Sequence, residues 1–140
     1  MTPLTAADFA KVQGTGYGLG TDGDLWAIDF EAAAGQAPVQ LTAGTYDAVM
    51  LVALAAVAAG TDDPSRTDIQ AALQTINDPT GTVVSYGGYA AGVAALNAGT
   101  PINYEGVSGS LDFSGDRNAV VSPLDRWRIE NGAFVFTPIQ

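Results

Sequence analysis

The feature that most constrains the fold of this chain is a long apolar run inside residues 45–59. Thr45 is a good helix N-cap, and Asp47 follows where a helix dipole favours a carboxylate. Every residue between Asp47 and Gly60 is apolar, and Gly60 is a natural helix end. The pattern predicts a helix over residues 45–59 that is buried almost all round. The run is too short for a membrane span, which needs about 20 residues.

The flanking sequence predicts an α/β fold with three to four helices packed on a small sheet with C-terminal hairpins. A helix is expected from Asp24 to Gly35, with Asp22 or Asp24 as its cap. Another is expected from Asp63 to Asn77, with Pro64 at its first position and an apolar stripe of Ile69, Ala72, Leu73 and Ile76. A further helix is expected over residues 89–97. Strands are expected over residues 110–113, 126–130 and 134–136, with a turn at residues 114–116 and a hairpin turn at Asn131 and Gly132. Residues 24–140 are therefore expected to form a single domain.

Glycines occupy every second position from residue 14 to residue 20. A dinucleotide-binding loop needs a third glycine three residues after the second, directly before a helix, and this position is Leu19 here. No lysine follows, and no convincing hydrophobic strand precedes. We therefore interpret residues 1–23 as a weakly ordered or hinge-like segment.

Charge and composition exclude several classes of function. Fifteen acidic residues against five basic ones leave no basic stripe for nucleic acid or an anionic membrane surface. The absence of cysteine and histidine excludes disulfides, thiolate or imidazole metal sites, and Ser-His-Asp or Cys-His catalysis. We expect no cofactor. The first residues have neither a basic nor a hydrophobic region, so no signal peptide is expected in this sequence.

Carboxylate pairs are the remaining catalytic material, and each lies in an expected turn or cap. The pairs are Asp22 with Asp24, Asp62 with Asp63, and Asp112 with Asp116. Aspartate is favoured at such positions because its side chain bonds nearby backbone. None of these segments has the ligand spacing of a calcium loop. Acid–base chemistry on a sugar or phosphate would require two carboxylates converging in one pocket.

Seven aromatic residues could line a small-molecule pocket, although core packing is the simpler explanation for most. They are Tyr17, Trp26, Tyr46, Tyr86, Tyr89, Tyr104 and Trp127. Tyr46 differs because it is expected at a helix N-terminus. There its ring can face a cleft while free backbone amides attract an anionic ligand group such as a carboxylate.

Four motifs in order resemble one family. They are Tyr-Asp-Ala-Val at residues 46–49 with the apolar run after it, residues 71–76, residues 102–113 continuing to Gly115 and Asp116, and residues 127–129 with 131–135. Over about residues 40–137 the chain resembles the C-terminal segment of type I periplasmic substrate-binding proteins of ABC transporters, the branched-chain amino-acid-binding class. The turn after Phe113 is shorter than the family's usual form.

The resemblance implies that the chain forms a partial, Rossmann-like lobe of a two-lobed α/β receptor that closes on an amino acid or similar small molecule. It implies that Tyr46 lines the cleft and that Gly14 and Thr15 enter an inter-lobe crossing, as a hinge. It also implies a periplasmic or extracellular, lipoprotein-like setting and a membrane permease as partner. Most of both lobes is absent from this sequence. The alternative is therefore a stand-alone half-receptor that acts as a structural or oligomerisation module, as a homo-oligomer or with a complementing N-terminal fragment.

Overall fold

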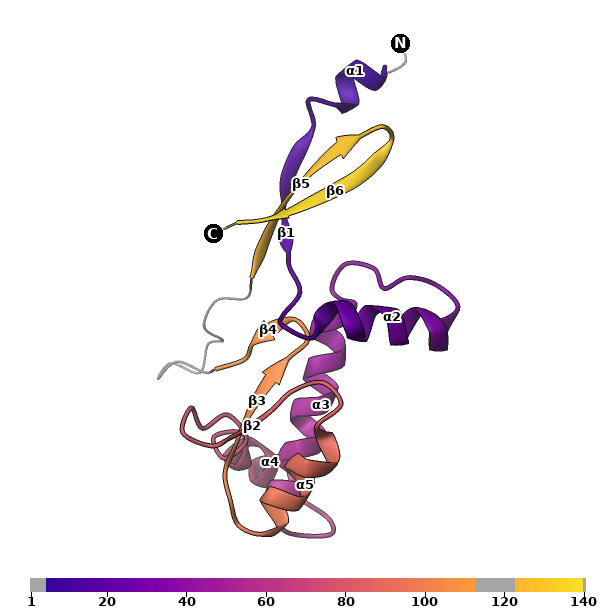
Figure 1. Ribbon diagram of the computed structural model, residues 1–140. Coiled ribbons are helices and arrows are strands. Elements are labelled where there is room, and N and C mark those ends of the chain that lie inside the picture. Colours follow the sequence, from indigo (N-terminus) through magenta and orange to yellow (C-terminus); the bar gives the residue numbers. More distant parts are fainter. Residues whose placement is uncertain (1–4, 113–122, 140) are drawn as a thin grey trace.

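The computed structural model describes residues 5–112 and 123–139. Within these residues the fold is mixed α/β, which confirms the expected class (Figure 1). The helices are α1 (Ala6–Phe9), α2 (Gly23–Ala34), α3 (Thr42–Ala58), α4 (Arg66–Ala72) and α5 (Tyr89–Asn97). The strands are β1 (Gln13–Tyr17), β2 (Thr82–Val84), β3 (Ile102–Gly106), β4 (Gly109–Ser110), β5 (Leu124–Glu130) and β6 (Ala133–Pro138). They form two three-stranded sheets, ordered β1-β5-β6 and β2-β3-β4.

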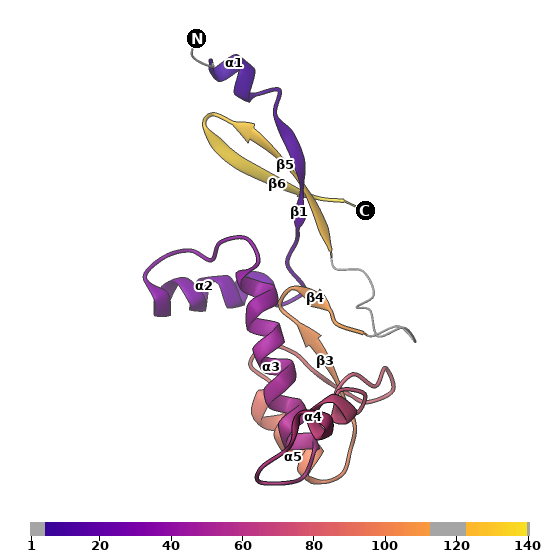
Figure 2. The same cartoon turned by 180° about the vertical axis from the view of Figure 1, so that it is seen from behind.

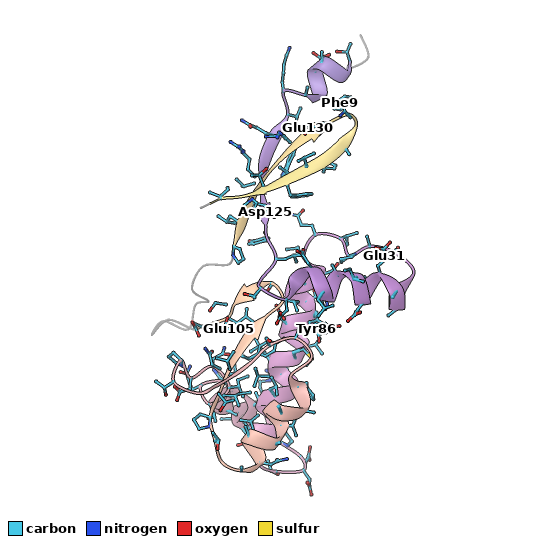
Figure 3. All side chains as sticks on the ribbon, in the orientation of Figure 1. Phe9, Glu31, Tyr86, Glu105, Asp125 and Glu130 are labelled. Atoms are coloured by element: carbon cyan, nitrogen blue, oxygen red, sulfur yellow. The ribbon has the colours of Figure 1, made fainter. Side chains whose placement is uncertain are left out.

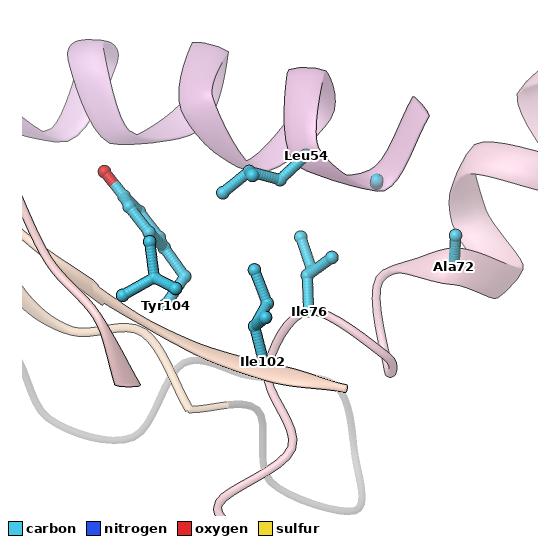
Figure 4. Packing of buried hydrophobic residues seen from close by; sticks show 7 residues of the cluster. Leu54, Ala72, Ile76, Ile102 and Tyr104 are labelled. Carbon is cyan, nitrogen blue, oxygen red and sulfur yellow. The ribbon is translucent and has the colours of Figure 1, made fainter. Parts of the chain in front are cut away.

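The larger part of the molecule is built around α3, and we call it the body (residues 18–112). Its sheet pairs β2 parallel to β3, with α5 as the crossover between them, and β3 antiparallel to β4. Helices α4 and α5 both pack against α3. The fully buried Leu54 of α3 meets Ile76 and Ile102 in the core, beside Tyr104 (Figure 4). The helices therefore lie on one face of this sheet.

Helix α3 differs from its sequence prediction in its start and in its burial. It begins at Thr42, three residues before the expected cap, because Leu41 takes the N-cap position in a left-handed conformation. Thr45 instead lies inside the helix and donates its hydroxyl to the Leu41 carbonyl. The expectation of burial all round is wrong, since Val49 and Val52 are more than half exposed. In the described part of the chain, packing elements cover only one side of α3. No described helix is long and apolar enough to cross a membrane.

Helices α2 and α5 follow their predictions closely. Helix α2 ends at a left-handed Gly35, as expected of a glycine after a helix, and α5 spans the expected residues. Helix α4 starts later than predicted, after Ser65, so Pro64 precedes its cap and is outside its first turn. The stripe on this segment is confirmed: Ala72 and Ile76 are buried in the core cluster, and Ile69 and Leu73 pack against it.

The cap of α4 is a reciprocal capping box. The Asp68 amide donates to Ser65 Oγ at 3.3 Å, and the Ser65 amide donates to Asp68 Oδ2 at 2.9 Å. The hydroxyl of Ser65 also donates to this carboxylate at 2.6 Å, and these bonds lower the pKa of Asp68. Sequence reasoning placed the start of this helix at Asp63 and overlooked the Ser-x-x-Asp spacing that marks it.

We expect Ser65→Ala to lower the free energy of unfolding by about 1 kcal/mol, because the Asp68 amide loses its acceptor and the Asp68 carboxylate loses one of its donors. Chemical denaturation followed by circular dichroism measures the change. Thr67→Ala, at an exposed position inside the same helix, is the matched control and should raise stability by about 0.5 kcal/mol, because alanine suits a helix better than threonine. Equal losses in both variants would contradict the role given to the cap.

The second sheet, β1-β5-β6, projects from the body and carries α1 at its far end (Figures 1 and 2). The predicted hairpin is confirmed, because Asn131 and Gly132 both have positive φ, as a two-residue turn between β5 and β6 requires. Part of the glycine-rich stretch is a strand, where we expected an irregular connection. Gly14 pairs with Trp127, whose indole occupies the space a Cβ would need.

This sheet has one apolar and one polar face. Trp127 lies opposite Phe136, and Ile129 opposite Phe134, so these four side chains share a face. Phe134 packs edge-on against Trp127 at 5.4 Å between ring centroids. Both phenylalanines remain more than half exposed. Within the described residues, this apolar face has no covering layer.

Candidate functional site

Tyr46 lies in a row of aromatic side chains where α2, α3 and the loop after β2 meet. Trp26 is buried and stacks obliquely between Phe30, at 5.4 Å, and Tyr46, at 5.8 Å. Tyr86 continues the row, 6.1 Å from Tyr46. Tyr46 and Tyr86 are half-buried, so this end of the row reaches solvent. The arrangement offers aromatic surface with two phenol groups, which is the composition of many small-molecule sites.

Both phenols of this row remain protonated hydrogen-bonding groups at neutral pH. Tyr86 donates to Asp29 Oδ2 at 2.9 Å, and this bond is the main reason that the pKa of Tyr86 is raised. Burial, followed by the charge of Asp47, raises the pKa of Tyr46. Because α3 starts at Thr42, Tyr46 lies in its second turn, and the free amides of the helix start precede it. Contrary to the sequence prediction, Tyr46 therefore does not lie beside free amides that could bind an anionic ligand group. The role of Tyr46 in a ligand site stays a prediction.

The next residue, Asp47, is buried to 1% exposure and fixes the body's loop structure. Its Oδ1 accepts from Tyr104 Oη at 2.9 Å and from the Val107 amide at 3.0 Å. Its Oδ2 accepts from the Ser108 amide at 2.8 Å and the Ser108 hydroxyl at 2.6 Å. Four donors satisfy this carboxylate, which makes its burial tolerable. Asp47 thereby joins α3 to the turn between β3 and β4.

Burial is the main cause that raises the pKa of Tyr104 far above its usual range, followed by the charge of Asp47 and by the hydrogen bond to it. Sequence reasoning missed this carboxylate clamp because it assigned Asp47 to the first turn of the helix. The sequence feature that could have revealed the clamp was a single carboxylate at the start of an otherwise apolar helix. A buried charge in such a position needs several donors.

Gly106 and Gly109, which flank the turn that Asp47 holds, lie in one wall of a cavity of about 410 Å³. The cavity is lined by Leu19, Gly20, Thr21, Asp22, Ser85, Glu105, Gly106, Gly109, Ser110 and Pro123. Its polar groups are hydroxyls and two carboxylates, and no described basic residue lines it. Figure 3 shows Glu105 on β3 in the body and Tyr86 in the loop beside α2. This cavity can accept hydrogen bonds from a small polar ligand that carries N–H or O–H groups.

Residues 18–22, which we call the crossing segment, connect β1 of the second sheet to α2 and pass beside this cavity, where they make two backbone hydrogen bonds. The Gly18 amide donates to the Pro123 carbonyl at 2.7 Å, and the Gly20 amide donates to the Val107 carbonyl at 2.7 Å. A Cβ at Gly20 would lie 2.5 Å from the Gly106 carbonyl oxygen. The crossing segment therefore packs backbone to backbone on the turn that Asp47 holds.

The structure separates most of the residues that sequence reasoning grouped. Tyr46 is not among the residues that line the cavity, and Gly14 and Thr15 lie in β1, paired with β5. Their hinge role stays a prediction. Asp22 and Asp24 lie at the start of α2, and Asp62 and Asp63 are exposed before α4. Asp112 accepts a bond from Ser110, whereas its expected partner Asp116, the turn at 114–116 and the shortened turn after Phe113 lie outside the described residues.

Two carboxylates do share the cavity, but they are Asp22 and Glu105, a pair that sequence spacing did not suggest. Across the described ranges, no three side chains of His, Cys, Asp or Glu form a group that could hold a metal ion.

Comparison with known proteins gives one informative similarity. The chain is 29% identical over 89 residues to the chemotactic signal transduction system substrate-binding protein BasB of Halobacterium salinarum. The match covers 64% of this chain and 20% of that protein, so this chain spans about a fifth of its relative. No family model matches the chain, and no solved structure matches it.

Proposed function

We propose that this chain is the ligand-binding, non-catalytic segment of a solute receptor for amino-acid-like small molecules in ABC-type uptake. The observation that carries the proposal is the similarity over 89 residues to a protein named as a substrate-binding protein. The ordered motifs of the sequence point the same way, through the resemblance to branched-chain amino-acid receptors. The receptor acts in the periplasm or at the cell surface and delivers its ligand to a membrane permease.

The aromatic row supports a ligand site that includes Tyr46. Its rings supply apolar surface, and the phenols of Tyr46 and Tyr86 supply hydrogen bonds at the solvent-facing end. Trp26 lies 5.8 Å from Tyr46, so its fluorescence reports on changes at this site. A site of this kind binds the side chain of an amino acid by stacking and burial.

Titration of the chain with a panel of amino acids, by calorimetry and tryptophan fluorescence, tests the proposal. We expect saturable binding of at least one of them, weakened about tenfold or more by Tyr46→Ala because an aromatic contact in a pocket is lost. Tyr17→Ala, on the separate sheet, is the control and should leave binding unchanged. Absence of heat with every amino acid, in this chain and in any longer chain that contains it, would overturn the amino-acid assignment.

The non-catalytic part of the proposal has its own measurement, because Asp22 and Glu105 share a cavity and carboxylates also serve hydrolases. Ligands incubated with the chain should be recovered chemically unchanged. Product formation that disappears in Glu105→Gln would replace the receptor with an enzyme.

The exposed apolar face of the β1-β5-β6 sheet favours a second candidate, a half-receptor that acts as a structural or oligomerisation module. A two- or three-stranded sheet with an uncovered apolar face gains stability from a covering layer. Sedimentation velocity over a range of concentrations distinguishes the two candidates. A monomer at all concentrations that still binds ligand would eliminate the module.

A further inference from the structure

Polar side chains gather on the face of β3 that points away from the helices. Ile102 and Tyr104 point to the core, so the alternation of the strand turns Asn103 and Glu105 to the opposite face. Asn77 lies opposite Asn103 in an antiparallel bridge, and Ser110 lies opposite Glu105. Residues directly opposite each other share a face. We call Asn77, Asn103, Glu105, Ser110 and Asp112 the outer polar cluster.

Hydrogen bonds fix the orientation of these side chains. The Asn77 amide nitrogen donates to the Leu111 carbonyl at 2.8 Å, and the Asn103 amide nitrogen donates to Glu105 Oε1 at 3.2 Å. Ser110 Oγ donates to Asp112 Oδ2 at 3.0 Å. Reversing either asparagine would place its amide oxygen against a carbonyl or carboxylate oxygen, so the oxygens must point the other way.

These bonds occupy donors of the cluster and leave three of its acceptor oxygens unpaired. Asn77 and Asn103 are only 8% and 7% exposed. Their Oδ1 atoms, and Oδ1 of Asp112, are buried without a hydrogen-bond partner among the described residues. Buried polar atoms are almost always paired, since an unpaired one costs about 1–3 kcal/mol. Three unpaired acceptors in one linked cluster therefore indicate a bound species that is positive or rich in donors.

We propose that Oδ1 of Asn77, Asn103 and Asp112 bind a calcium ion on the outer face of β3. Amide and carboxylate oxygens are the ligands of Ca²⁺, which accepts irregular geometry and completes its shell with water and backbone carbonyls. The net charge of −10 raises the local concentration of cations. A single buried water donates only two hydrogen bonds and leaves one of the three oxygens unpaired.

This site differs from the calcium loop that the sequence lacks, because its ligands come from three separate segments. They lie after α4, on β3 and after β4. With two amides and one carboxylate as ligands, and Glu105 beside Asn103, the site is weakly charged. We therefore expect a dissociation constant of about 10⁻⁴–10⁻³ M, as in extracellular calcium modules.

Thermal unfolding in a chelator and in about 5 mM CaCl₂, at constant ionic strength, tests the proposal at this affinity. We expect Ca²⁺ to raise Tm by about 3–8 °C and Mg²⁺ to raise it less, because Mg²⁺ demands stricter geometry. Asp112→Asn should abolish the calcium shift. Asp63→Asn removes an equal charge at an exposed position and should retain it.

A gain-of-function variant keeps the test decisive if Asp112→Asn fails to fold. Asn77→Asp adds a carboxylate beside the Leu111 carbonyl, so without metal it should unfold at lower temperature than the parent. Calcium should restore its stability and bind about tenfold more tightly than in the parent. No calcium shift in the parent, or an equal shift in Asp112→Asn, would overturn the proposal.

Discussion

Replacing Asp47 by alanine is expected to lower the free energy of unfolding by about 3–5 kcal/mol, the largest effect of any single polar substitution proposed for this chain. The reason is the set of donors that the substitution leaves behind. Tyr104 Oη and the Val107 amide both lose their acceptor in buried hydrogen bonds. The Ser108 amide and hydroxyl lose their acceptor in partly buried hydrogen bonds. Hydrogen bonds to a charged acceptor contribute about 1.5–3 kcal/mol each, and the orphaned donors add their desolvation cost.

Urea unfolding followed by circular dichroism measures this loss, with Asp62→Ala as the control. Asp62 is exposed and accepts no side-chain hydrogen bond among those the structure describes, so the control should change stability by less than about 0.5 kcal/mol. Asp47→Asn should lie closer to alanine than to the parent, because an amide brings a donor to a position surrounded by donors. A loss below about 1 kcal/mol for Asp47→Ala would mean that the carboxylate is not held as described.

A double-mutant cycle with Tyr104→Phe separates the clamp from general damage. Tyr104→Phe alone removes one donor and should cost about 1–2 kcal/mol, since it leaves Asp47 with its other bonds. In the Asp47→Ala background the same substitution should cost little, because the hydroxyl has already lost its acceptor. Coupling below about 0.5 kcal/mol would contradict a direct bond between the two side chains.

The sequence predicted those helices and turns whose ends are set by residues within the same short segment. Helix α5 was found because Gly99, which has positive φ, follows its last turn, and the hairpin turn was found because Asn131 and Gly132 both suit positive φ. Strand β3 was not predicted from its pattern, although the alternation of Ile102 and Tyr104 with Asn103 is a strand signal. Strand β2 has only three residues, too few for a period to be recognised.

Long-range causes explain what could not be predicted. The partners of Asp47 lie 57 to 61 residues later in the chain, so no local pattern could reveal the clamp. The exposure of Val49 and Val52 has the same origin, since burial depends on which elements arrive to cover a helix. The cavity joins the crossing segment to β3 and β4, and its two carboxylates are far apart in sequence.

The crossing segment gives the second large prediction, a comparison of two glycines that only the structure can tell apart. At Gly20 a Cβ would lie 2.5 Å from the Gly106 carbonyl oxygen and 2.7 Å from the Gly109 amide nitrogen. These are backbone atoms of the turn that Asp47 holds, so they are not free to move away. We expect Gly20→Ala to destabilise the chain by about 2 kcal/mol, a typical cost of overpacking.

Gly44 is the matched control, and it should change stability in the opposite direction. It lies in α3, where a Cβ would meet no atom within 4 Å and φ is not positive. Alanine there should stabilise the chain by about 0.5–1 kcal/mol, because it restricts the unfolded chain and suits a helix. Parallel denaturation of Gly20→Ala and Gly44→Ala gives the two signs. If Gly20→Ala is as stable as Gly44→Ala, the crossing segment does not pack on the turn between β3 and β4. The cavity that the crossing segment and this turn enclose would then be wrong.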